Sequence, residues 1–185
     1  MKAAVFLADG FEEIEAITPL DLLRRAEIDV TSFSVQEKHD VTGRHNIIIR
    51  ADALITEFRK NNDTLYDCLI LPGGIPGADN LKKCSKLLSE IKIHFQAGKL
   101  IAAICAAPLI LSDLDLLSEF RAVCYPADMD KLKAHIVSGN EKTVIDRNLI
   151  TSAGAGTAVD FSLAIISSLL GRQVSDKLSR KIIYA

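Results

Sequence analysis

The feature that most constrains this fold is a repeated alternation of short apolar runs with longer segments whose apolar residues recur at helical spacing. The runs KAAVFLA (2–8), YDCLILPGG (66–74) and KLIAAI (99–104) have the length of buried strands, and IDVTSFSV (28–35) alternates like a half-buried one. Strands that alternate with helices indicate a parallel sheet. The sequence therefore predicts a doubly wound α/β domain with a mostly parallel central sheet and helices on both faces.

The segments between these strands predict the covering helices. GFEEIEAITPLDLLRRA (10–26) starts with carboxylates and ends with arginines, and Pro19 is expected to kink or split it. DNLKKCSKLLSEIKIHFQAG (79–98) predicts one helix that ends at Gly98. A helix started by Pro108 is expected in 106–117, and a long apolar one in 155–171.

Shorter elements complete the expected order. HNIIIR (45–50) and FRAVCY (120–125) predict short strands, and TVIDRNLITS (143–152) predicts a hairpin around Asp146 to Asn148. Ligands of doubly wound folds collect outside the carboxyl ends of the strands. We therefore look for a site in the segments that follow the predicted strands.

Composition and charge exclude several classes of function. The net charge of -2 and the scattered basic residues do not favour nucleic acid. The N-terminal run is too short for a signal segment, and no stretch has the length of a membrane span. The four cysteines form no CxxC pair, which favours a reducing compartment. We expect a soluble cytoplasmic protein with a single domain over residues 1–185 and no nucleic-acid or membrane partner.

Cys105 lies between a predicted strand and the helix that Pro108 is expected to start. Free N–H groups and the dipole at a helix N-terminus can lower the pKa of a thiol from about 8.5 to roughly 3.5–7.5. The thiolate attacks carbonyl carbon or reduces peroxide. The residues alone also permit a plainer interpretation, in which Cys105 is one more small apolar side chain of AAICAAP. The other cysteines, Cys68, Cys84 and Cys124, have only that interpretation.

Two further features follow predicted strands. In LPGGIPGADNL, a backbone N–H of Gly73 or Gly74 can help to hold an oxyanion, although a plain turn is the alternative. In GFEEIEA, helical spacing places Glu15 near an apolar stripe, whereas Glu12 is expected to point elsewhere. A carboxyl group in a partly apolar pocket beside a thiol has a raised pKa and can pass a proton. A solvated glutamate in the first turn of the helix is the alternative.

Four segments together resemble the ThiJ/PfpI superfamily, in its DJ-1-like branch, in that family's order and at its spacing: ADGFEEIEAITPLDLLRRA, YDCLILPGGIPGADNL, KLIAAICAAPLIL and TSAGAGTAVDFSLAII. The resemblance covers nearly the whole chain. It implies a flavodoxin-like sandwich with a reactive cysteine on a strained strand-to-helix elbow and a protonated glutamate against its sulfur. By position, Cys105 is that cysteine and Glu15 that glutamate, and the amides of Gly74 and Ala106 hold the anion.

The chain departs from the family pattern at two places. Tyr125 stands where several relatives carry a histidine, and a phenol is a poor base at neutral pH although it can donate a hydrogen bond. Ala106 stands where the protease-like and amidotransferase-like branches have a histidine in that neighbourhood. Glu15 is therefore expected to carry the proton transfers. We expect the histidines to be surface or loop residues, namely His39, His45, His94 and His135.

The resemblance implies an enzyme that acts on a small reactive aldehyde or dicarbonyl without metal, glutathione or another cofactor. A glutathione-independent glyoxalase, which is a lyase, and a deglycase, which is a hydrolase, use the same thiohemiacetal chemistry. The alternative is an oxidative-stress sensor or chaperone in which Cys105 is oxidised without turnover. Relatives are commonly dimers, so we expect a homodimer whose contact uses apolar residues of the first helix and neighbouring strands.

Overall fold

A seven-stranded sheet in the order β10-β11-β7-β6-β1-β2-β5 forms the centre of the protein. The computed structural model describes residues 1–60 and 64–184. The strands of this sheet are β1 (Lys2–Leu7), β2 (Asp29–Ser34), β5 (Ala53–Leu54), β6 (Cys68–Leu71), β7 (Leu100–Ile104), β10 (Thr143–Asp146) and β11 (Leu149–Ser152). Every neighbouring pair is parallel except β10 and β11, which form the predicted hairpin. The parallel strands β2, β1, β6, β7 and β11 follow the flavodoxin-like order.

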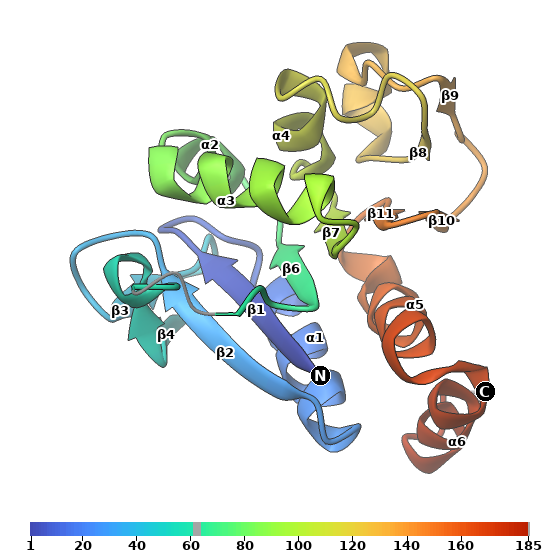
Figure 1. Cartoon of the computed structure of the whole chain (residues 1–185), viewed down its shortest axis with the longest axis horizontal. Coiled ribbons are helices and arrows are strands. Elements are labelled where there is room, and N and C mark those ends of the chain that lie inside the picture. The colour runs from blue at the N-terminus through green and yellow to red at the C-terminus, as the bar shows by residue number, and fades with distance from the viewer. Residues whose placement is uncertain (61–63, 185) are drawn as a thin grey trace.

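Helices cover both faces of this sheet, which confirms the predicted fold class (Figure 1). One face carries α1 (Glu13–Arg25), α5 (Ala158–Leu170) and α6 (Arg172–Lys181), and the other carries α2 (Gly77–Lys82), α3 (Ser85–Gln96) and α4 (Pro108–Asp113). Side chains of a strand alternate between the faces. In β1, Val5 therefore packs with the first group of helices and Phe6 with the second.

Two small sheets lie outside the central one. β3 (Asp40–Thr42) pairs antiparallel with β4 (Ile48–Arg50), so the short strand expected in 45–50 exists as half of a hairpin. β8 (Arg121–Ala122) pairs with β9 (Ile136–Val137). The strand expected in 120–125 is therefore present, but only two of its residues pair with another strand. Short 3₁₀ helices occur at η1 (Ile55–Glu57), η2 (Pro126–Lys131) and η3 (Ala155–Thr157).

Three helix predictions need correction. The helix expected over 79–98 is two helices, α2 and α3, because Cys84 is extended and the six-residue step from Leu81 to Leu87 does not fit one continuous stripe. Pro19 does not split α1, whose inner face stays buried along its length. The helix started by Pro108 ends at Asp113, and α6 has no counterpart among the predicted elements.

His94 is fully buried in α3, so the expectation of a surface or loop position was wrong for this residue. Its ring Nδ1 lies 2.7 Å from the carbonyl oxygen of Glu90, and Tyr66 N donates to Nε2 at 3.2 Å. Burial lowers the pKa of His94. The residue follows Ile91 by three positions, so helical spacing already placed it on the inner face.

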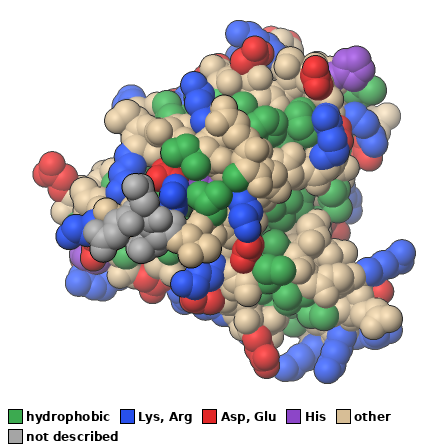
Figure 2. Space-filling model, viewed as in Figure 1, with side chains coloured by type: hydrophobic (Ala, Val, Ile, Leu, Met, Phe, Trp, Pro, Cys, Tyr) green, Lys and Arg blue, Asp and Glu red, His purple; other side chains and the backbone are tan. Residues whose placement is uncertain are grey.

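Charge is mixed on the face that Figure 2 shows. Lys and Arg side chains are interspersed there with Asp and Glu, and several basic side chains lie over α6. No helix in the described part of the chain has both the length and the apolarity needed to cross a bilayer.

Candidate active site

A pocket of about 360 Å³ opens at the carboxyl ends of the central strands, where the topology predicts a ligand site. Segments that follow β1, β6, β7 and β11 all reach it, and the chain reverses its direction of winding between β1 and β6. The residues that line it are Glu12, Glu15, Arg44, Gly74, Ile75, Cys105, Ala106, Tyr125, Asp128 and Ala155. The sheet therefore brings together residues that lie far apart in the sequence.

Cys105 occupies a sharp bend between β7 and α4. Its φ of 63° lies in the left-handed region that non-glycine residues rarely adopt. Two backbone hydrogen bonds hold the bend, since Cys105 N donates to Ser152 O at 2.8 Å and Tyr125 N donates to Cys105 O at 2.9 Å. The residue is half-buried and lines the pocket. The structure thus has the elbow that the resemblance implies.

Glu15 is fully buried on the inner side of α1, beside Cys105. Its Oε2 accepts a hydrogen bond from Gly73 N at 2.8 Å. Its Oε1 has no hydrogen-bond partner among the described residues, although it is buried. Burial raises the pKa of Glu15 to about 7, against the opposing hydrogen bonds from Cys105 and Gly73. A carboxyl group with this pKa exchanges its proton near neutral pH.

The pKa of the Cys105 thiol is raised, which corrects the expectation of a lowered value. Burial, followed by the charge and hydrogen bond of Glu15, raises the pKa to about 12, while the N–H groups of Gly74 and Ala106 lower it. The expected lowering depended on a helix dipole, and α4 has only six residues. The anion-stabilising groups are therefore the two amides. Two of the three causes that raise the pKa come from the Glu15 carboxylate.

The two glycines after β6 have different surroundings. Gly73 donates its N–H to Glu15, so this group is not free to hold an oxyanion as was expected. A methyl group at Gly73 would also lie 2.7 Å from Glu15 Oε2 and 2.8 Å from Cys105 Cβ. Gly74 has a φ of +87° and turns its N–H toward the thiol. Gly74 and Ala106 thus remain as the donors around the sulfur.

The ring of Tyr125 lies at the exposed side of the pocket. About half of this residue is accessible, and it faces Gly154, where an added methyl group would lie 3.6 Å from the Tyr125 ring and 3.9 Å from Cys105 Sγ. Gly154 was not predicted as a site residue, although it lies within the segment TSAGAGTAVDFSLAII. Tyr125 and Cys105 therefore share one wall of the pocket.

The expectation that Glu12 points elsewhere was wrong, because its side chain lines the pocket with Glu15. Glu12 precedes the first turn of α1 in extended conformation, so helical spacing does not apply to it. Glu12, Glu13 and His45 place three possible metal-ligand atoms within 4.8 Å of one another. Glu13 already accepts hydrogen bonds from His45 N at 2.7 Å and from Nδ1 at 2.9 Å. These hydrogen bonds hold the loop between β3 and β4 against the start of α1.

Comparison with protein-family models matches residues 1–168 to the DJ-1/PfpI family. The chain belongs to the DJ-1/PfpI family. Toxoplasma gondii DJ-1, oxidized, a solved structure, superimposes on it with a TM-score of 0.94 at 36% identity, covering 100% of this chain and 98% of that one. The family and fold that the four segments predicted are therefore confirmed.

Curated relatives of the DJ-1/PfpI family differ in length and in name. Protein DJ-1 homolog B of Arabidopsis thaliana is 36% identical over 183 residues, which cover 98% of this chain but only 41% of that protein. The chain thus spans about two fifths of this relative. Glutathione-independent glyoxalase DJR-1.2 of Caenorhabditis elegans is 30% identical over 187 residues, covering 100% of this chain and 97% of that protein.

The buried carboxyl group predicts a specific pH dependence of stability. Because its pKa is raised in the folded state, Glu15 stabilises the fold most below pH 4.5 and loses that contribution as the pH rises through about 7. At about 1.4 kcal/mol per pKa unit, the loss is on the order of 3 kcal/mol. Glu15→Gln should remove it, as measured by urea unfolding at several pH values.

The exposed Glu37 provides the control, since Glu37→Gln should keep the wild-type pH profile. A Glu15→Gln profile parallel to that of wild type would contradict the raised pKa.

Proposed function

We propose that this protein is a glutathione-independent glyoxalase that converts small 2-oxoaldehydes to 2-hydroxy acids. The observation that carries the proposal is a half-buried thiol placed, in one pocket, between two backbone N–H donors and a carboxyl group whose pKa is about 7. A nucleophile, an oxyanion site and a proton carrier are the groups that this reaction requires. The glyoxalase name of the Caenorhabditis elegans relative supports the same assignment.

The reactive form is the one in which Glu15 holds the proton and Cys105 carries the negative charge. With Glu15 protonated, its charge no longer opposes the thiolate, and the carboxylic acid becomes a hydrogen-bond donor through Oε1. The amides of Gly74 and Ala106 then offset part of the cost of burying the sulfur anion. The pair thus holds one negative charge and one proton between its two groups.

The catalytic cycle balances without an external oxidant. The Cys105 thiolate adds to the aldehyde carbon of methylglyoxal, and the amides of Gly74 and Ala106 hold the resulting alkoxide until Glu15 protonates it. The Glu15 carboxylate then takes the proton from this carbon and gives it to the ketone oxygen, which forms an enediol, and next takes the proton of the first hydroxyl group and gives it to the neighbouring carbon. The product is a thioester of lactate, which water hydrolyses to lactate and free thiol. The aldehyde carbon is oxidised and the ketone carbon reduced.

Tyr125 is proposed to donate a hydrogen bond to the substrate rather than to act as a base. Its ring is half exposed at the pocket, and the O–H of a phenol can donate a hydrogen bond. This assignment leaves the proton transfers to Glu15. It also explains how the pocket functions without the histidine that several relatives carry at this position.

An oxidative sensor is the second candidate, and the accessibility of the sulfur supports it. Cys105 reaches the pocket while Cys68 and Cys124 are buried, and the same two amides suit the oxygens of a sulfinate. The solved Toxoplasma gondii relative is itself an oxidized DJ-1. Both functions need the Cys105 thiolate, so turnover distinguishes them.

We also propose that the protein forms a homodimer through an apolar surface on α1 and the β3–β4 hairpin. Four isoleucines are exposed to solvent on these elements, namely Ile14, Ile17, Ile47 and Ile48. Large apolar side chains left exposed on two elements support an interaction surface there.

The glyoxalase proposal predicts distinct losses for the pocket residues. Cys105→Ser removes the nucleophile and should lower kcat/KM for methylglyoxal by at least about 10³-fold. Glu15→Gln removes the proton carrier and should lower it by about 10²–10⁴-fold. Tyr125→Phe, which removes one hydrogen bond, should cost about tenfold. The measurement is lactate formation over time.

Cys84→Ser is the matched control, because Cys84 is partly exposed but lies outside the pocket, and its lactate production should equal that of wild type. Lactate formation that survives Cys105→Ser would contradict the proposal. Stoichiometric oxidation of Cys105 by dilute peroxide without lactate formation would favour the sensor.

The dimer proposal is tested by sedimentation. Wild type should sediment as a dimer, and Ile17→Glu together with Ile48→Lys should give a monomer, because charges on a buried apolar contact are costly. Ile145→Glu, at a half-exposed position on β10, is the control and should stay dimeric. A monomeric wild type at working concentration would overturn the proposal.

A further inference from the structure

Arg44 is the one Lys or Arg that lines the pocket among the residues the structure describes. Its side chain is about half exposed, and its ion-pair contact with Glu12 is long, since Nη1 lies 4.0 Å from Oε2, the limit of such a contact. A guanidinium group carries five N–H donors. Most of the donor capacity of Arg44 is therefore available to a ligand in the pocket.

The backbone that carries Arg44 is fixed, in contrast to its side chain. Arg44 N donates to Phe11 O at 2.9 Å, directly ahead of α1. The buried Glu13 carboxylate holds the next residue, His45, by its backbone N–H and its ring. A methyl group at Gly43 would collide with the Glu13 carboxyl group, so the loop packs closely against it. These contacts present the guanidinium at the mouth of the pocket.

Two of the three acidic residues that line the pocket with Arg44, Glu12 and Asp128, have other side-chain neighbours. Asp128 pairs with Lys131 at 2.6 Å, and Glu12 lies 3.6 Å from His45 Nδ1. The pocket volume of about 360 Å³ is several times that of a three-carbon oxoaldehyde. The pocket thus has both the space and the free cationic group for a longer, negatively charged substrate.

We propose that Arg44 binds a carboxylate of the substrate, so that the preferred substrates are 2-oxoaldehydes whose side chain ends in a negatively charged group. This inference rests on the proposed glyoxalase function and specifies its substrate class. Arginine binds carboxylate through two parallel N–H donors, which fixes the orientation as well as the charge of the ligand. The reaction is unchanged, because the distant carboxylate takes no part in the internal transfer of hydrogen from one carbon to the next.

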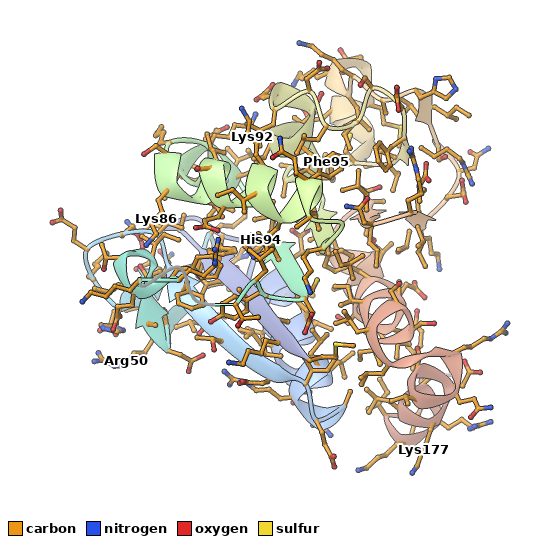
Figure 3. The ribbon with its side chains drawn as sticks, in the orientation of Figure 1. Arg50, Lys86, Lys92, His94, Phe95 and Lys177 are labelled. Carbon is orange, nitrogen blue, oxygen red and sulfur yellow. The ribbon has the colours of Figure 1, made fainter. Side chains whose placement is uncertain are left out.

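The test compares kcat/KM for 4,5-dioxopentanoate with kcat/KM for methylglyoxal. We expect wild type to prefer the anionic substrate and Arg44→Gln to lower the ratio of the two values by about 10- to 100-fold. Arg44→Lys keeps the charge but not the paired donors, so its ratio should lie between those of wild type and Arg44→Gln. The control is Arg50→Gln on the neighbouring strand β4, where Arg50 projects outward and pairs with Asp40, and it should keep the wild-type ratio (Figure 3).

A second variant changes the ratio in the opposite direction. Glu12→Gln removes the carboxylate that competes for Arg44, so it should raise the preference for the anionic substrate about two- to fivefold. The charge of Glu12 also raises the pKa of Glu15, but both substrates use the same Glu15, so this effect cancels in the ratio. A rise in the ratio is not a result that misfolding produces.

Binding measured without turnover separates this inference from the proposed function. In the Cys105→Ser protein, 2-hydroxyglutarate should bind at least tenfold more tightly than in Cys105→Ser with Arg44→Gln, as measured by calorimetry. Turnover of methylglyoxal with an unchanged ratio in Arg44→Gln would overturn the inference and leave the glyoxalase function intact. Equal affinity of the two Cys105→Ser proteins would overturn it as well. Absence of turnover for both substrates, with Arg44-dependent binding, would overturn the glyoxalase function alone.

Discussion

The site depends on one interaction, the contact between a buried carboxyl group and a thiol at the carboxyl ends of a parallel sheet. Burial raises the pKa of Glu15 to about 7 and opposes a second negative charge on Cys105. Backbone N–H groups offset part of the cost of burying these charges. Gly73 donates to the Glu15 carboxyl group, and Gly74 and Ala106 donate to the Cys105 sulfur. The two acids therefore compete for a single proton rather than ionising independently.

The fold supplies this contact through its topology. Glu15 follows β1, the glycine pair follows β6 and Cys105 follows β7, and these three strands are neighbours in the sheet. Parallel strands deliver all three segments to the same edge. The bend at Cys105 is held from both sides by hydrogen bonds to Ser152 and Tyr125, which stabilise a backbone conformation that is unfavourable on its own.

Features that depend on local pattern could be predicted from the sequence, and those that depend on distant contacts could not. Strand and helix periodicity predicted the sheet, whereas the residues alone left plainer interpretations of Cys105 and Glu15 open, and the resemblance of four segments to a known family selected these two residues. The place of Arg44 depends on the β3–β4 hairpin folding against the start of α1, a contact without a sequence motif. The thiol pKa was expected in the wrong direction because local reasoning included the helix terminus but not the burial and the charge of Glu15.

The most direct test of the shared proton is a titration of the Cys105 thiolate by its ultraviolet absorbance, with Cys105→Ser as the blank. In wild type we expect the thiolate absorbance to rise only at strongly alkaline pH, because Glu15 has lost its proton by about pH 7 and its charge then opposes the thiolate. Glu15→Gln removes that charge and should move the rise to lower pH. A single step near the ordinary thiol pKa of about 8.5 in both proteins would contradict the account.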